Sequence, residues 1–562
     1  MNSIPENRRL LILWIIPLIF LGIFFFYPLS SILGLAVQSF MHGTSTINWG
    51  GILKPLGFTL YQASLSTLLT ILVGIPAAFL FGRFDFKGKG ILRILATLPF
   101  ILPTVVVAAG FNALVGPRGW LNVVFMQLLQ LNQPPIQILN SLSAILLAHV
   151  FYNTAVVIRT VGTALEQLDP RLEQAGRTLG ASPWRSFWQV TLPLIRPALA
   201  SAALVVFLFD FTSFGVILLL GGPQYATLEV EIYNQTMQLL NLPQASLLSV
   251  IQMACTFLLT VLILRGGGGL AVPVAPRVKR EPISSAYTWR EKVFIVFMMA
   301  ILIVLLVLPL AALVLRSVVY LEAGSGSTVS FSTRFTLEYY QELFINRRQS
   351  LFYVPPIQAL LNSLAYAVAT SLLALFFGSL ASYALAQNNR INSFFDPVLM
   401  LPMGASAVTL GLGFIVAFSR FPNARSLFPF LIPCAHALIA LPFVVRVLQP
   451  ALASIPATLK QAAATLGASP WQVWKRIELP IISRAASVAA LFSFTISLGE
   501  FGATAFLSRP DIPTLPVAIF RFLGLPGALN YGQALAMATI LMLLCALVMI
   551  MIDHSRNIIN IN

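Results

Sequence analysis

The stretch Gln174–Pro193 reads Gln-Ala-Gly-Arg-Thr-Leu-Gly-Ala-Ser-Pro-Trp-Arg-Ser-Phe-Trp-Gln-Val-Thr-Leu-Pro, and a second copy follows at an offset of 287 residues. The second copy, Gln461–Pro480, begins Gln-Ala-Ala-Ala and keeps Leu-Gly-Ala-Ser-Pro-Trp unchanged. Both copies are polar islands in an apolar chain. We therefore expect two equivalent water-facing elements, called the first knob (174–193) and the second knob (461–480).

Each knob carries the signals of two short helices joined at a rigid corner. Gly180 suits the left-handed conformation that ends a helix. Ser182 is a preferred N-cap residue, and Pro183 suits the first position of the next helix. Gly467, Ser469 and Pro470 repeat this chemistry in the second knob.

The composition is that of an integral membrane protein. Hydrophobic residues make up 58% of the 562 residues and charged residues only 9%, against about 25% charged in soluble domains. The apolar runs reach the roughly 20 residues that a membrane helix needs. Lys and Arg exceed Asp and Glu, 34 to 18, but they lie in short loops, which favours the positive-inside rule over nucleic-acid binding.

The hydropathy pattern predicts an all-α membrane protein with about twelve transmembrane helices. In the first half the expected spans are 10–37, 58–82, 91–115, 138–161, 190–220 and 243–264. In the second half they are 293–316, 357–386, 394–418, 430–450, 477–507 and 531–552. The basic loops place both termini and both knobs on the cytoplasmic side of the inner membrane.

The chain divides into two similar halves. Residues 1–265 and 292–562 each hold about six expected spans, and residues 266–291 read as a flexible, basic cytoplasmic linker. Further matches occur at the same offset, for example Phe214 with Phe501 and His149 with His436. Since both halves begin and end inside, the repeat is parallel, with its axis along the membrane normal.

Two acidic residues fall inside equivalent expected spans. Asp210 aligns with Ser497, and Glu500 aligns with Ser213. A carboxylate near the bilayer centre costs roughly 2.5–3.5 kcal/mol on insertion scales, so it faces the protein interior or a water-filled path. Either these residues and Asn153 line a path for a cationic solute, or each acid pairs with an arginine such as Arg159 or Arg446. His149 and His436 fit hydrogen bonding between packed helices, with a proton or metal role as the alternative.

The knobs resemble the cytoplasmic "EAA" loop of binding-protein-dependent ABC transporter permeases. That pattern has Glu-Ala-Ala, a Gly after three further residues, and Ile-x-Leu-Pro after nine more; here Gln174 and Gln461 replace the Glu. What the resemblance implies is a type I importer permease, on which a cytoplasmic ABC ATPase dimer docks. The implied docking residues are Gln174, Ala175, Gly176, Gly180, Ser182, Pro183 and Trp184, and Gln461, Ala462, Ala463, Gly467, Ser469, Pro470 and Trp471.

The resemblance also implies an extracytoplasmic solute-binding protein as a partner. The outer segment Gly221–Tyr233 and the run Ser497–Gly502 are similar to permeases of thiamine importers and of their ferric-iron relatives. Thiamine or a related cation is the leading solute, and ferric iron is the alternative. The sequence carries no P-loop, so we expect no enzyme activity and no cofactor in this chain, with ATP and Mg²⁺ on the partner subunit. A secondary transporter of twelve helices is a further alternative, and it has no need of two matched knobs.

Overall fold

The computed structural model describes residues 6–41, 48–266, 288–319, 334–345, 354–387, 390–421 and 424–561. Within these residues the chain is helical, and its single β-bridge joins Val319 to Phe335. Among these residues, ten helices are long and apolar enough to cross a membrane, and two further helix pairs, each bent by more than 40°, bring the number to twelve if each pair is one span. The all-α class with about twelve membrane helices is confirmed.

The helices of the first half have these bounds: α1 Glu6–Leu21, η1 Gly22–Phe26, α2 Tyr27–Met41, α3 Gly50–Arg83, α4 Lys89–Thr97, η2 Leu98–Phe100, α5 Thr104–Val115, α6 Trp120–Leu128, α7 Leu142–Gln167, α8 Pro170–Thr178, α9 Pro183–Ser186, η3 Phe187–Thr191, α10 Leu192–Phe211, α11 Gly215–Leu220, α12 Leu228–Tyr233, η4 Asn234–Gln238 and α13 Leu242–Gly266.

The helices of the second half have these bounds: α14 Trp289–Leu306, α15 Leu308–Ser317, α16 Glu338–Gln341, η5 Glu342–Phe344, α17 Pro356–Leu385, α18 Arg390–Gly404, α19 Ala407–Phe418, α20 Ala424–Ala453, α21 Ala457–Thr465, α22 Pro470–Val473, η6 Trp474–Glu478, α23 Leu479–Gly499, α24 Gly502–Leu507, α25 Leu515–Gly524 and α26 Ala528–Ile561. Most of the expected linker 266–291 lies outside the described residues, so its character stays a prediction.

Four of the expected spans are broken rather than straight. The spans expected at 91–115 and 394–418 bend by 110° and 95° between helices. The spans expected at 190–220 and 477–507 end early, at Phe211 and Gly499, and a six-residue helix follows each break. The four expected spans stay mostly apolar across their breaks, so the hydropathy pattern could not predict where the helices are interrupted.

The first membrane helix of each half packs against the other half. Trp14 of α1 is buried, donates a hydrogen bond to Asn392 of α18 and packs on the ring of Phe395. In the reverse direction, the ring of Phe294 of α14 packs against those of Phe79 and Phe84 in the first half. The halves are therefore interlocked rather than merely adjacent.

Small residues let the central helices of each half approach closely. A Cβ added at Gly74 of α3 would lie 2.7 Å from the side chain of Val157 of α7. The equivalent Gly378 of α17 is as close to Val444 of α20, at 2.5 Å. Lipid tails are as apolar as the helix side chains, so the hydrophobic effect does not drive membrane helices together. They associate instead through close backbone packing of this kind.

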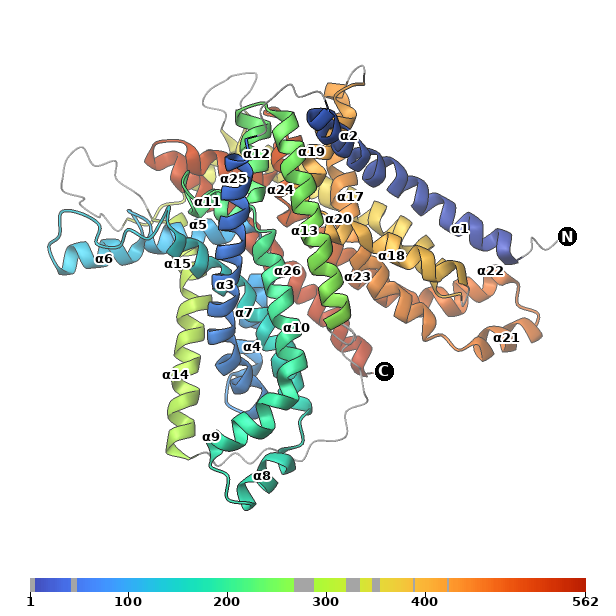
Figure 1. Cartoon of the computed structure of the whole chain (residues 1–562), viewed down its shortest axis with the longest axis horizontal. Coiled ribbons are helices and arrows are strands. Elements are labelled where there is room, and N and C mark those ends of the chain that lie inside the picture. The colour runs from blue at the N-terminus through green and yellow to red at the C-terminus, as the bar shows by residue number, and fades with distance from the viewer. Residues whose placement is uncertain are drawn as a thin grey trace.

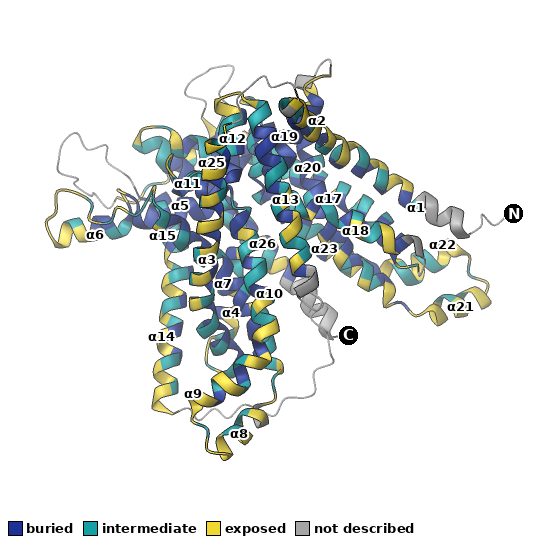
Figure 2. Cartoon of the chain, in the orientation of Figure 1, coloured by how far each residue is buried: buried dark blue, intermediate teal, exposed yellow. Residues whose placement is uncertain are grey.

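The two halves diverge toward the knobs. Figure 1 shows α8 and α9 at the end of one arm and α21 and α22 at the end of another, with the arms joined at the opposite end of the molecule. Figure 2 shows buried residues concentrated where the arms meet, and exposed residues along the outer helices and on both knobs. The knobs therefore lie at the ends of separate arms, and the arms meet at the opposite end of the molecule.

Candidate functional site

The first knob has the corner that its sequence predicts. Helix α8 ends before Gly180, whose φ is +89°, and Cβ-bearing residues rarely adopt that conformation. The Ser182 hydroxyl accepts a hydrogen bond from the backbone N–H of Arg185, with Pro183 at the start of α9. The π-helical turn η3 then leads into α10.

The second knob repeats this geometry with different neighbouring side chains. Gly467 has a φ of +83°, and the Ser469 hydroxyl accepts from the N–H of Gln472. The Gln472 side chain accepts from the Ser469 N–H in return, which completes a capping box. A π-helical turn, η6, again joins the knob to the following span.

The two knobs expose the same apolar residues. Leu179 is 89% exposed and Leu466 is 88% exposed, and Trp184 and Trp471 are 70% and 65% exposed. These four residues are called the knob faces. Paired apolar residues held in water by a rigid corner are typical of an interaction surface.

The remaining predicted knob residues lie on α8 and α21. Gln174, Ala175, Gln461 and Ala462 are exposed. Gly176 instead approaches Ser186 of α9, since a Cβ there would lie 3.6 Å from the Ser186 hydroxyl. Docking at any of these residues stays a prediction.

Each knob is tied to the end of a central helix, by different chemistry in each half. In the first half Arg83 of α3 forms an ion pair of 2.9 Å with Glu173 of α8. In the second half Tyr383 of α17 donates a hydrogen bond to Glu478 and accepts one from the Trp474 indole. These contacts join each knob directly to the end of α3 or α17.

Asp210 lies at the first helix break, in a buried polar network. Its Oδ1 accepts a hydrogen bond of 2.7 Å from Asn153 and lies 3.3 Å from Nδ1 of His149. Its backbone carbonyl accepts from the side chain of Gln62. The second carboxylate oxygen, Oδ2, has no hydrogen-bond partner among the described residues.

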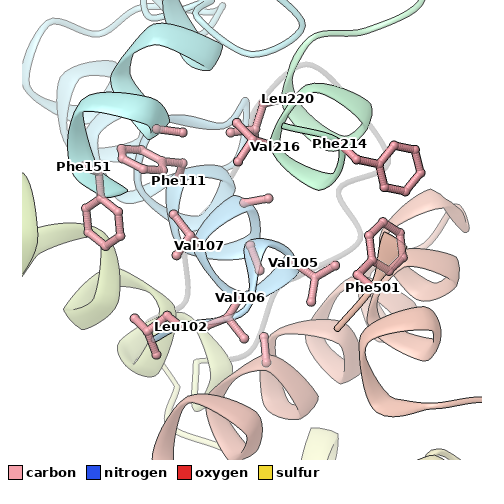
Figure 3. Packing of buried hydrophobic residues seen from close by; sticks show 14 of the residues in the cluster. Leu102, Val105, Val106, Val107, Phe111, Phe151, Phe214, Val216, Leu220 and Phe501 are labelled. Atoms are coloured by element: carbon pink, nitrogen blue, oxygen red, sulfur yellow. The ribbon is translucent and has the colours of Figure 1, made fainter. Parts of the chain in front are cut away.

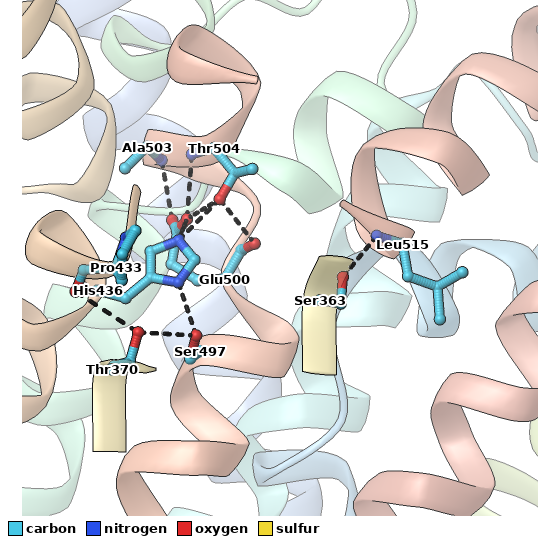
Figure 4. A network of polar contacts seen from close by, with 9 residues as sticks. All are labelled: Ser363, Thr370, Pro433, His436, Ser497, Glu500, Ala503, Thr504 and Leu515. Atoms are coloured by element: carbon cyan, nitrogen blue, oxygen red, sulfur yellow. Dashed lines mark hydrogen bonds and ion pairs between the residues drawn. The ribbon is translucent and has the colours of Figure 1, made fainter. Parts of the chain in front are cut away.

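Glu500 lies at the second break and holds the helix that follows. Its carboxylate accepts from the N–H groups of Ala503 and Thr504 at 2.8 and 3.1 Å, and Oε2 lies 3.0 Å from Nε2 of His436. Nδ1 of the same imidazole lies 2.8 Å from the Ser497 hydroxyl, which donates in turn to Thr370. Figure 4 shows His436 between these groups.

The two networks are equivalent, but the acid and the hydroxyl have exchanged places. In both halves Nδ1 of the histidine faces the earlier position, Asp210 or Ser497, and Nε2 faces the later one, Ser213 or Glu500. The acids therefore pair with histidines, and Arg446 instead pairs with Asp396 at 3.7 Å. The sequence shows that the two histidines are equivalent, 287 residues apart, but it does not predict their contacts with the carboxylates.

Next to these networks, two phenylalanines meet between the halves. The rings of Phe214 and Phe501 stack with centroids 5.5 Å apart and planes 20° apart. Figure 3 shows the two rings facing each other from different halves, beside the buried residues of α5. The sequence aligned these residues without indicating that they touch.

Among the described residues, no group of three or more His, Cys, Asp or Glu side chains is placed to hold a metal ion. The candidate functional features are the two knob faces, the two broken spans with their buried acids, and the aromatic pair between them.

Comparison with known families gives one match that covers both halves. The model described as "Binding-protein-dependent transport system inner membrane component" matches residues 71–324 and 374–557. These two segments include both knobs, the two acid–histidine pairs at the helix breaks, and both phenylalanines of the stacked pair.

Individual relatives match over most of their length. The chain is 28% identical over 507 residues to the thiamine transport system permease protein ThiP of Brucella abortus, covering 89% of this chain and 87% of the relative. It is 26% identical over 517 residues to ThiP of Escherichia coli, covering 89% of each. A solved bacterial alginate ABC transporter in complex with its periplasmic protein aligns at a TM-score of 0.38 and 19% identity, over 44% of this chain and 89% of that one.

Proposed function

The chain belongs to the family of binding-protein-dependent transport system inner membrane components, and we propose that it is the transmembrane subunit of an ATP-driven importer of thiamine. The observation that best supports an importer is the pair of knob faces. They recur at one offset in the two halves, with the same corner geometry and nearly equal exposure. Two equal surfaces fit a partner with two equal subunits.

That partner is a cytoplasmic ABC ATPase dimer, with one subunit on each knob. ATP and Mg²⁺ bind to the ATPase, and this chain binds neither. Both knobs and both chain termini lie on the cytoplasmic side of the inner membrane. The proposed orientation follows from the basic loops, because Lys and Arg accumulate on that side.

Transport follows from the shape of the two arms. Closure of the ATPase dimer on ATP draws the knobs together, and the ties at Arg83 and Tyr383 carry this movement into α3 and α17. The arms then close at the knob end and part at the opposite end, where a loaded binding protein delivers its solute. ATP and the loaded binding protein act together because both favour this state over the resting one.

Thiamine is supported by the names of the relatives and by the buried acids. The relatives from Brucella abortus and Escherichia coli are both described as thiamine transport permeases, and they match nearly the whole chain. Thiamine carries a permanent positive charge on one ring. Oδ2 of Asp210 is a buried acceptor with no hydrogen-bond partner among the described residues, and a carboxylate near the first helix break suits a cationic solute better than an anionic one. Asp210, Ser213, Ser497, Glu500 and Asn153 remain our proposed path residues.

The test uses the chain reconstituted in liposomes with its candidate ATPase and binding protein. We expect thiamine-loaded binding protein to stimulate ATP hydrolysis and thiamine uptake. The variant Leu179→Asp/Leu466→Asp should lose both activities, because charge on the knob faces opposes apolar docking. Leu179→Met/Leu466→Met is the matched control and should keep them.

The outcomes separate the candidate functions. Stimulation by ferric iron but not by thiamine would keep the importer and change the solute. Uptake driven by an ion gradient with no ATPase bound, in protein shown to be folded, would contradict the importer and favour a secondary transporter.

A further inference from the structure

The contact between Phe214 and Phe501 defines a position in the molecule. The two residues are separated by the same offset of 287 that relates the knobs. When two units are related by a two-fold axis, a residue that touches its own equivalent lies on that axis. The stacked rings therefore lie on the axis between the halves, and a path that follows this axis passes them.

Both rings are buried at this position on the axis. Phe214 is 6% exposed and Phe501 is 3% exposed. A Cβ added at Gly215, the residue after Phe214, would lie 3.3 Å from the ring of Phe501 and 2.2 Å from the hydroxyl of Thr104. The break in the span thus lets the backbone bring one ring directly against the other.

Further aromatic rings surround the pair. The ring of Tyr233 lies 5.4 Å from that of Phe214, and the ring of Phe520 lies 5.4 Å from that of Phe501. Phe506 packs edge-on against Tyr233 at 5.5 Å. The cluster takes rings from both halves and offers π faces to a solute.

Each ring is fixed to its own half by the residue before it. Ser213, next to Phe214, lies 2.9 Å from Nε2 of His149 on α7. Glu500, next to Phe501, lies 3.0 Å from Nε2 of His436 on α20. When the halves move, each phenylalanine must move with its own half.

We propose that Phe214 and Phe501 form an aromatic seal that selects for flat aromatic solutes. This inference rests on the proposed importer function. A ring sandwiched between two others needs the outer planes only roughly 7 Å apart, twice the contact distance of about 3.5 Å. Parting of the halves by a small amount therefore admits a flat ring, which stacks on both phenylalanines, before it admits a rounded solute of similar mass.

The first experiment tests the seal, in proteoliposomes that hold the chain with its ATPase. The vesicles are preloaded with choline, a rounded cation, and efflux is measured without ATP or binding protein. We expect efflux to rise by roughly tenfold or more in Phe214→Leu/Phe501→Leu, because the lost rings leave a gap on the axis. Phe209→Leu is the control, since Phe209 lies on α10 before the break, is 40% exposed and packs in a tilted arrangement on Phe100, away from the stacked pair. Efflux equal to that of the control would overturn the seal.

The second experiment tests selectivity and does not depend on the leucine variant folding. Phe501→Trp keeps a ring at the seal and serves as a fluorescent reporter, with Phe209→Trp as background for the eight native tryptophans. With the ATPase held in its ATP state by a non-hydrolysable analogue, thiamine should quench the Phe501→Trp signal saturably and choline should not. Equal quenching by both, or by neither, would overturn the selection of flat solutes.

The two failures are distinguishable. If the importer proposal is wrong, thiamine-loaded binding protein does not stimulate the ATPase of the unmodified complex. If only the seal is wrong, this stimulation is present while choline efflux or quenching gives the overturning result.

Discussion

The imidazole of His149 lies 3.3 Å from the carboxylate of Asp210, and both side chains are almost completely buried. The corresponding pair in the other half uses the opposite ring nitrogen and a carboxylate three positions further along the chain. Each half therefore holds one acid and one hydroxyl around one histidine, in reversed order. This equivalence can be tested by exchanging the residues.

Asp210→Ser should lower stability and uptake, and Asp210→Ser/Ser213→Glu should recover much of both. The single change leaves the buried Asn153 amide without its acceptor, at a cost of about 1–3 kcal/mol. The double change returns a carboxylate to Nε2 of the histidine, as in the second half, but it still leaves the Asn153 amide without the Asp210 acceptor, so part of the loss should remain. Thermal unfolding in detergent and thiamine uptake are the measurements. A double variant no better than the single one would show that the halves are not interchangeable here.

Arg83→Gln should uncouple ATP hydrolysis from uptake without dissociating the ATPase. The ion pair between Arg83 and Glu173 joins the first knob to α3, while the knob face itself is untouched. The pair is partly buried, and its loss should cost about 1 kcal/mol at most. We expect more ATP hydrolysed per thiamine imported, measured in proteoliposomes. Lys87→Gln, a charge change of the same sign in the loop after α3, is the control. An unchanged ratio in both variants would exclude a coupling role for this ion pair.

Gly74→Ala and Gly378→Ala should each destabilise the chain, whereas Gly57→Ala should not. A methyl group at either of the first two positions meets a valine at 2.7 Å or less, and such overpacking costs about 1–3 kcal/mol. At Gly57, on the same helix as Gly74, nothing lies within 4 Å of the added atom. The unfolding temperature in detergent gives the comparison. Equal temperatures for Gly74→Ala and Gly57→Ala would mean that α3 and α7 are less tightly packed than described.

Gly180→Ala/Gly467→Ala should weaken ATPase binding while leaving the stability of the membrane part unchanged. Both glycines have positive φ and open space around them, so the cost of about 1–2 kcal/mol at each comes from the backbone alone. Gly180→Asn/Gly467→Asn should bind better than the alanine variant, because Asn adopts this conformation more readily. The measurement is the affinity of each purified variant for the ATPase. Equal affinity of the alanine and asparagine variants would contradict a role for the backbone conformation at these glycines.

Local chemistry explains which features the sequence could predict. The corner of each knob depends on a few adjacent residues, such as Gly180, Ser182 and Pro183, whose preferences act within one turn. The number of crossings follows from long apolar runs. These signals are contained in short segments, so the sequence alone predicts the knob corners and most helices.

Contacts between distant helices explain the rest. Asp210 and His149 are 61 residues apart in the chain, and only the packing of α10 on α7 decides that they meet. The breaks near Phe214 and Phe501 lie inside expected spans that stay mostly apolar despite Asp210 and Glu500, and hydropathy there has no signal for a change of direction. The stacked pair could be aligned from the repeat, but its position on the axis needed the arrangement of both halves.

The interlocked first spans also determine an order of events during synthesis. Trp14 is made 378 residues before its hydrogen-bond partner Asn392. At about 5–20 residues per second, the ribosome needs roughly 20–80 s to supply that partner. Throughout this interval the buried face of α1 must be occupied by lipid or by the insertion machinery. Because one messenger encodes both halves, every exchanged helix receives its counterpart from the same polypeptide, and mismatched assembly between separate subunits is avoided.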